Sequence, residues 1–160
     1  MIYTELTNKA MRIAYKAHNG QYDVNGVPYI FHPYHVAEQM SDEISTCAAL
    51  LHDVAEDTAV TLEMLEQEFP PEVTDALKLL THEKGTDYFE YVERIRENAV
   101  ARAVKLADLE HNSDTSRITD KNAVSAEKLA HWKYKYSTAR KILEEDNTIT
   151  QEQSENTKRQ

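Results

Sequence analysis

Apolar residues recur every three or four positions along most of this chain, which is the spacing that places them on one face of an α-helix. The periodicity stops at turn-forming residues, as at Asn25-Gly26 and at Gly85, where we predict loops. The predicted helices cover about residues 4–18, 33–40, 44–57, 62–69, 71–80, 88–98, 100–111 and 121–143. The pattern therefore predicts an all-α bundle of about seven to eight helices without a significant sheet.

The apolar stripe is clearest in the third predicted helix. Ile44, Cys47, Leu51 and Val54 follow one another at steps of three and four, so we expect one continuous helix that ends before Thr58. Cys47 is the single cysteine of the chain and lies on this stripe. It is therefore expected to be a buried small hydrophobe.

The length of 160 residues suits one domain with a sizeable core. We place that domain at residues 1–143. Residues 144–160 are polar and offer only Ile149 for burial, which predicts a flexible C-terminal tail. The chain has only three Gly and four Pro residues, in agreement with helices rather than a sandwich or a barrel.

Charge and hydropathy narrow the function classes. A formal net charge of -10 disfavours binding to a nucleic acid polymer, because phosphate binding along a polymer needs a broad basic surface. It leaves room for a small anionic substrate in a locally positive cleft. No N-terminal apolar run resembles a signal peptide, and no segment is long enough to span a bilayer. A cytoplasmic location without a membrane role is therefore the expectation.

The most informative feature is the pair His52-Asp53, which places an imidazole beside a carboxylate within an apolar helical pattern. Burying such a pair without a partner is unfavourable, and a divalent metal ion is a suitable partner. His32, at a loop-to-helix boundary, and Asp108, on a later helix, are further candidate ligands. Two imidazoles and two carboxylates suit Mn²⁺, Fe²⁺, Co²⁺ or Mg²⁺, and Zn²⁺ is also compatible. Such a site fits phosphoester hydrolysis better than acyl transfer, because the ion activates water and neutralises phosphoryl oxygens.

A group of carboxylates follows the His-Asp pair. Because a helix turns about 100° per residue, Asp53, Glu56 and Asp57 lie within one turn. The group is either a solvated acidic face at a helix end, or it contains a Glu56-Asp57 pair that orients the attacking water or takes up its proton.

A polar ridge runs beside the apolar stripe of the seventh predicted helix. It consists of Lys105, Asp108, Asn112 and Thr115. Asn and Thr are poor residues for the middle of a helix, so the ridge indicates either functional hydrogen bonding or an early helix end.

The other histidines carry weaker signals. His18 and His111 lie at or near apolar stripes, which favours buried histidines, with hydrogen bonding to a metal ligand as a further possibility. His35, His82 and His131 have no context that indicates a site role. For His32 a capping or packing role stays open.

Four segments carry a resemblance to a known family. They are Ala17-His-Asn-Gly-Gln21, Pro28-Tyr-Ile-Phe-His-Pro33, Ala49-Leu-Leu-His-Asp-Val-Ala-Glu-Asp-Thr58 and Val104-Lys-Leu-Ala-Asp-Leu-Glu-His-Asn112. In order and internal spacing they resemble the HD-domain superfamily of metal-dependent phosphohydrolases. The similarity is closest to the RelA/SpoT-type alarmone hydrolase domains and their small stand-alone relatives, and it extends over most of residues 1–143.

The resemblance implies an HD-type helical fold and assigns roles by motif. The implied metal ligands are His32, His52, Asp53 and Asp108, with manganese the usual ion of this branch. Glu56 and Asp57 would position or activate the attacking water. Asn112 and Thr115, with Lys105, would contact the substrate. The implied reaction is removal of the 3′-pyrophosphate from guanosine tetra- or pentaphosphate.

The chain departs from the branch where basic residues are usual. Asp23 and Val24 replace an Arg-Lys pair, and Leu109 and Asp114 stand at two further such positions. These changes keep two alternatives open, a nucleotide phosphomonoesterase and a non-catalytic helical module that binds a metal or a nucleotide. Aromatic residues at 132, 134 and 136 cannot all face one direction, so a homo-oligomer is also open.

Overall fold

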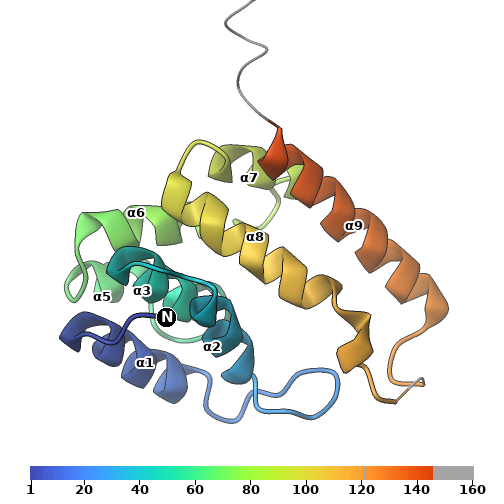
Figure 1. Cartoon of the computed structure of the whole chain (residues 1–160), viewed down its shortest axis with the longest axis horizontal. Helices are drawn as coiled ribbons and strands as arrows, with labels where there is room; N and C mark the ends of the chain where they lie inside the picture. Colours follow the sequence, from blue (N-terminus) through green and yellow to red (C-terminus); the bar gives the residue numbers. More distant parts are fainter. Residues whose placement is uncertain (121, 146–160) are drawn as a thin grey trace, which may run out of the picture.

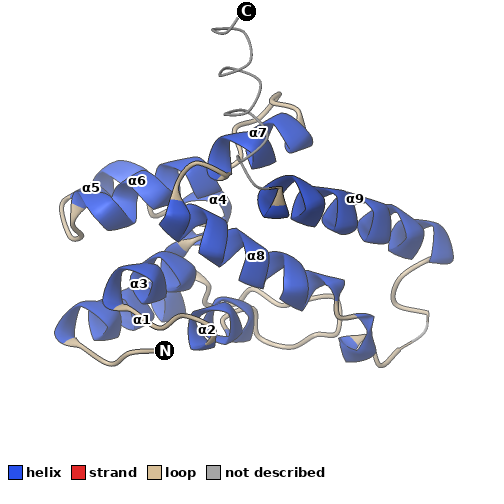
Figure 2. Cartoon of the chain, turned by 45° about the horizontal axis from the view of Figure 1, so that its top comes forward, coloured by secondary structure: helices blue, strands red, loops and turns tan. Residues whose placement is uncertain are grey.

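The computed structural model describes residues 1–120 and 122–145, and within them it is helical without a strand (Figure 2). The helices are α1 (Glu5–Ala17), α2 (Phe31–Glu38), α3 (Glu43–Leu51), α4 (Val54–Asp57), α5 (Leu62–Glu66), α6 (Pro71–Leu80), α7 (Tyr88–Ile95), α8 (Ala99–Ser113) and α9 (Ala126–Glu144), with a short 3₁₀ turn, η1 (Thr115–Arg117). An isolated bridge joins Tyr22 to Pro28 across the loop before α2. The prediction of an all-α fold is confirmed.

Helix α8 runs through the middle of the molecule (Figure 1). It contacts α2, α3 and α6 on one side, and α7 and α9 complete its surroundings. The largest fully buried side chains come from several of these helices: Leu50, Leu51, Val73, Leu77, Val92, Ile95, Val104 and Leu109. Because α2, α3 and α8 all meet at this core, polar residues at its edge are brought to one place.

The third predicted helix is not continuous, and this corrects the sequence-based expectation. It divides into α3 and α4 at His52-Asp53. The Nδ1 atom of His52 lies 2.7 Å from the carbonyl oxygen of Ala49, the acceptor that the N–H of Asp53 would use in an unbroken helix. A side chain that competes for a backbone acceptor interrupts the helix. The break therefore originates in the same histidine that the sequence singles out.

The last helix begins later than the predicted residue 121. Its N-cap is Ser125, whose hydroxyl accepts a hydrogen bond from the N–H of Lys128 at 3.2 Å. It ends at Glu144, the first residue of the predicted tail. Residue 121 lies outside the described residues. So do residues 146–160, which are nearly all of the predicted tail.

Two smaller expectations are also testable here. The side chain of Cys47 is fully buried, as its place on the apolar stripe predicts. None of the described helices combines the length and the apolar character needed to cross a bilayer.

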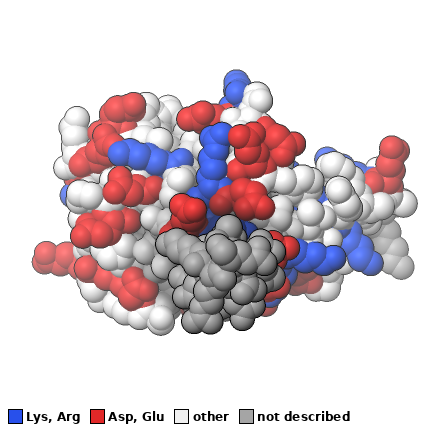
Figure 3. Space-filling model, turned by 90° about the horizontal axis from the view of Figure 1, so that it is seen from above, with Lys and Arg blue, Asp and Glu red and all other residues white. Residues whose placement is uncertain are grey.

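On the face in Figure 3, acidic side chains are spread widely, with lysines and arginines between them, in line with the net charge of -10.

Candidate metal centre

The four predicted metal ligands converge from three parts of the fold. His32 comes from α2, His52 and Asp53 from the break between α3 and α4, and Asp108 from α8. One ligand atom each of His32, His52 and Asp53 lies within 4.8 Å of the others. The Oδ1 atom of Asp108 is 3.1 Å from His32 Nε2 and 3.9 Å from His52 Nε2. Residues up to 76 positions apart in the sequence thus surround one small volume.

The buried ring of His52 directs its Nε2 atom at Asp53 and Asp108. Its side chain is 3 % exposed. Nδ1 donates to the carbonyl oxygen of Ala49, which leaves Nε2 as the ring nitrogen that could bind a metal ion, and this buried atom has no hydrogen-bond partner among the described residues. Nε2 lies 3.1 Å from Oδ2 of Asp53. A buried, unpartnered imidazole nitrogen beside two carboxylates is the arrangement that a divalent metal ion would complete.

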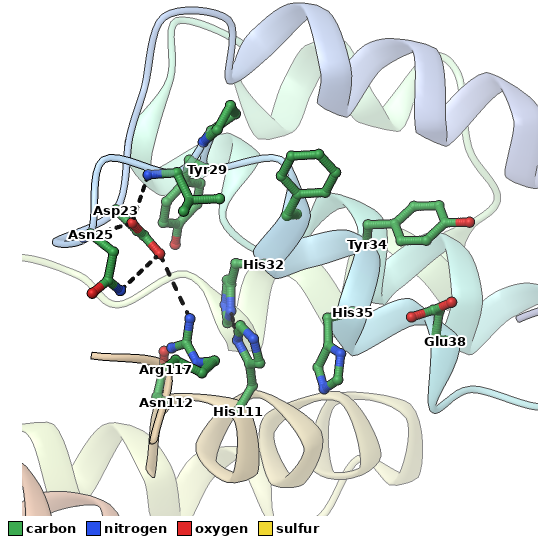
Figure 4. Close-up of a pocket in the computed structure, with 13 residues that line it drawn as sticks. Asp23, Asn25, Tyr29, His32, Tyr34, His35, Glu38, His111, Asn112 and Arg117 are labelled. Atoms are coloured by element: carbon green, nitrogen blue, oxygen red, sulfur yellow. Dashed lines mark hydrogen bonds and ion pairs between the residues drawn. The ribbon is translucent and has the colours of Figure 1, made fainter. Parts of the chain in front are cut away.

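His32 is oriented by a second histidine. Its Nδ1 atom lies 2.7 Å from Nδ1 of His111, which leaves Nε2 directed at the two carboxylates. The ring of His111 stacks between those of His32 and His35 (Figure 4). Burial, together with the neighbouring His32, Arg117 and His35, lowers the pKa of His111 to about 4. A neutral His111 can accept the Nδ1–H of His32, so His111 contacts a predicted metal ligand by a hydrogen bond in addition to packing.

Replacing His111 with alanine is expected to weaken metal affinity about 10- to 100-fold, because His32 loses the partner that fixes its ring. The change His111→Asn should retain more affinity, since its amide oxygen can take the place of Nδ1. Competition with a metal-binding dye measures both. His131→Ala, at an exposed position on α9, is the control and should bind metal as the wild type does. Equal affinity in His111→Ala would refute the orienting role.

Both carboxylates are held by hydrogen bonds. Tyr29 donates its hydroxyl to Oδ2 of Asp53 at 2.6 Å. The Nζ atom of Lys105 donates to Oδ2 of Asp108 at 2.8 Å, and the amide of Asn112 donates to Oδ1 at 2.6 Å. Burial works to raise the pKa of Asp108, but Lys105 and the two histidines outweigh it and hold this pKa well below its usual range. Asp108 therefore stays ionised, as a metal ligand must be.

Glu56 and Asp57 lie at the rim of this centre, on α4. The side chain of Glu56 accepts the backbone N–H of His82 at 2.9 Å. The backbone carbonyl of Asp57 accepts the side-chain amide of Gln21 at 2.8 Å. Loss of hydration raises the pKa of Asp57, and the negative charges of Asp53 and Glu56 raise it further. A carboxylate with a raised pKa beside a metal centre is suited to accept a proton from water.

Two cavities border the ligands. The larger, of about 500 Å³, lies between the loop before α2, the α2 helix and the end of α8, and Figure 4 shows its walls. The smaller, of about 170 Å³, lies beside His52, Asp53 and Asp108. Tyr29 and Asn112 line both cavities. The candidate centre is thus open on two sides.

The three residues predicted to contact substrate are placed differently. Asn112 lines both cavities and Lys105 lines the smaller one, while each also holds Asp108. Thr115 lies in η1 and lines neither of them; it borders a separate surface cavity beside α9. Substrate contact remains a prediction for all three.

The residues that stand in place of the expected basic residues make other contacts in the fold. Asp23 accepts the backbone N–H groups of Asn25 and Val27 at 2.8 and 3.0 Å, and its Oδ2 is 3.7 Å from Nη1 of Arg117. Its charge therefore organises the loop and faces a guanidinium. Leu109 is buried in the core, and Asp114 caps η1 by accepting the N–H of Ser116. Neither Leu109 nor Asp114 lines the two cavities.

Four residues at the centre were not singled out from the sequence. Tyr29 could have been found from its place in the Pro28–Pro33 block, three residues before His32. His82 donates its backbone N–H to the side chain of Glu56, and any residue except proline could supply this donor, so the sequence gives no sign of it. His35 and Lys135 reach the cavities through packing of α2 and α9, which depends on long-range contacts. Their sequence context therefore holds no signal.

This chain is similar in sequence to a known family and to curated proteins. A family model described as HD domain matches residues 10–143. A guanosine-3′,5′-bis(diphosphate) 3′-pyrophosphohydrolase from Borreliella burgdorferi is 36% identical over 131 residues, covering 71% of this chain and 19% of the relative. The protein of the same name from Haemophilus influenzae is 37% identical over 123 residues, covering 64% and 17%. The chain therefore spans about a fifth of the length of these curated relatives.

A solved structure shares the fold. It belongs to a protein described as a metazoan ortholog of SpoT that hydrolyzes ppGpp. The match has a TM-score of 0.73 at 23% identity and covers 89% of this chain and 94% of the other. At this identity the likeness establishes the arrangement of helices.

Proposed function

Because this chain belongs to the HD domain family, we propose that it is a metal-dependent phosphohydrolase that removes the 3′-pyrophosphate of guanosine tetra- or pentaphosphate. The observation that carries the proposal is the meeting of His32, His52, Asp53 and Asp108 around the unpartnered Nε2 atom of His52. A mixed set of imidazoles and ionised carboxylates fits one divalent cation, and we propose Mn²⁺, with Mg²⁺, Fe²⁺, Co²⁺ and Zn²⁺ as the ions to compare.

The metal would supply an activated water and neutralise charge on the phosphoryl oxygens. The water oxygen would form a bond to the phosphorus next to the 3′ oxygen, and the electron pair of the broken P–O bond would pass to that oxygen. Glu56 and Asp57, at the rim, orient the water and take up its proton. Lys105 and Asn112 keep the Asp108 carboxylate ionised and fixed, so the centre is organised before substrate arrives.

The larger cavity is suited to the nucleoside. Its volume of about 500 Å³ is in the range of small-molecule sites. Its walls include the rings of Tyr29, Phe31 and His35, which offer stacking surfaces for a base. Arg117 also lines it. These features support a nucleotide as substrate, while a cytoplasmic location, the lack of nucleic acid binding and self-association stay predictions.

Purified protein loaded with each divalent metal should release pyrophosphate from guanosine tetraphosphate and lose that activity on chelation. The screen includes common mononucleotides, because the loss of the usual Arg-Lys pair at Asp23 and Val24 favours a nucleotide phosphomonoesterase as the second candidate. Release of orthophosphate from a mononucleotide, with guanosine tetraphosphate left intact, would replace the first function by the second. Metal and nucleotide binding without turnover of either class would favour the non-catalytic module.

A further inference from the structure

The small cavity beside the metal centre contains two lysines from different helices. Lys105 comes from α8 and Lys135 from α9, and both line the cavity of about 170 Å³. The same cavity is bordered by Asp53 and Asp108, two of the candidate metal ligands. A group that enters it therefore lies next to the metal centre.

The two lysines differ in what they contact. Lys105 is committed to Asp108 through a 2.8 Å hydrogen bond. The Nζ atom of Lys135 lies 4.2 Å from the centre of the Tyr88 ring and 5.9 Å from that of Tyr136. Among the described residues, no carboxylate lies within 4.0 Å of this ammonium group. Burial and the neighbouring Lys105 ammonium lower the pKa of Lys135. Within the described part of the chain, the Lys135 side chain therefore reaches the cavity without a carboxylate partner.

The charges around the cavity determine which ligand fits. Two ammonium groups and the imidazole of His52 face three carboxylates, those of Asp53, Glu56 and Asp108. With His52 neutral as a metal ligand, a divalent cation at the centre would bring the positive charges to four against three negative ones. The cavity would then favour an anion more strongly in the metal-bound protein than in the metal-free protein. Its volume of about 170 Å³ suits a phosphate-sized group better than a nucleoside.

We propose that Lys135 forms an oxyanion subsite in this cavity, and this inference rests on the proposed function. The subsite binds the terminal phosphate of the pyrophosphate group that is removed. The rings of Tyr88 and Tyr136 hold the ammonium group of Lys135 in place through cation–π contacts. The nucleoside then occupies the larger cavity, and the two cavities receive opposite ends of the substrate across the metal centre. Lys135 serves as a substrate-binding residue supplied by the C-terminal helix.

Inorganic pyrophosphate is the probe, because it tests the subsite without turnover. Isothermal titration of the manganese-loaded protein, corrected by a titration into buffer of the same manganese content, gives its affinity. We expect Lys135→Met to weaken binding about tenfold or more, since one charge-assisted contact is lost. Lys135→Arg should retain most of the affinity. Lys141→Met, an exposed position on the same helix, should bind as the wild type does.

Metal-free protein should bind pyrophosphate at least about tenfold more weakly than the loaded protein, because the divalent cation beside the subsite is missing. Thermal melts check that Lys135→Met folds, and Lys135→Gln replaces it if the melt is lost. Unchanged affinity in the folded variant, or no binding by the wild type, overturns the subsite. A protein that binds pyrophosphate through Lys135 but leaves guanosine tetraphosphate intact would retain the subsite and reject the proposed function.

Discussion

Replacing Asp108 with alanine is expected to abolish hydrolysis and to lower the free energy of unfolding of the metal-free protein by about 3–5 kcal/mol. The change removes a candidate metal ligand and leaves the ammonium of Lys105 without its carboxylate. That ammonium belongs to a side chain only 13% exposed, so water cannot replace the lost partner. Urea denaturation in the presence of a chelator measures the stability effect, and elemental analysis measures the loss of metal.

A double variant separates the two contributions of Asp108. Adding Lys105→Met to Asp108→Ala removes the stranded charge, so most of the lost stability should return while metal binding stays lost. The control is Asp75→Ala, whose carboxylate forms an exposed pair with Lys78 and whose loss should change stability by less than about 1 kcal/mol. If Asp108→Ala unfolds at the same urea concentration as the wild type, the buried pair does not stabilise the fold.

Changing Glu56 to glutamine or Asp57 to asparagine is expected to lower kcat by about 10²- to 10⁴-fold, because each change removes a carboxylate able to take a proton from water. Metal content should stay at the wild-type level, since neither residue is among the candidate ligands. Initial rates on the substrate identified in the screen, with elemental analysis of the same samples, measure both quantities.

An acidic residue away from the centre provides the comparison. Glu63→Gln, at an exposed position on α5, should leave the rate unchanged. Full activity in both Glu56→Gln and Asp57→Asn would rule out their role with water and return these residues to a solvated acidic face.

The helical fold and the four converging residues could be predicted because their signals are local. Helical periodicity marks α1, α6 and α8 within a few residues of their observed ends. The His52-Asp53 pair is conspicuous because polar residues in an apolar stripe need a partner. Asp108 lies on a polar ridge, and two other residues of that ridge, Lys105 and Asn112, donate hydrogen bonds to its carboxylate.

The break after α3 and the position of Lys135 at the small cavity could not be predicted, for two different reasons. The break depends on the rotamer of His52, which decides whether its ring competes for the carbonyl oxygen of Ala49. Lys135 depends on how α9 packs beside α7 and α8, and aromatic residues all around α9 conceal which face is inward. Periodicity reports on a single helix and carries no information on such pairings.

The contacts of Tyr29 would link the binding of a metal ion to the binding of a nucleotide. Its hydroxyl joins the loop before α2 to Asp53 by a 2.6 Å hydrogen bond, while its ring borders both cavities. An ion that fixed the Asp53 carboxylate would also restrain this loop, which forms a wall of the larger cavity. Because linkage is reciprocal, a nucleotide that orders the loop would raise the affinity for the ion by the same factor as the ion raises the affinity for the nucleotide. Substrate and metal would thus retain each other through one phenol.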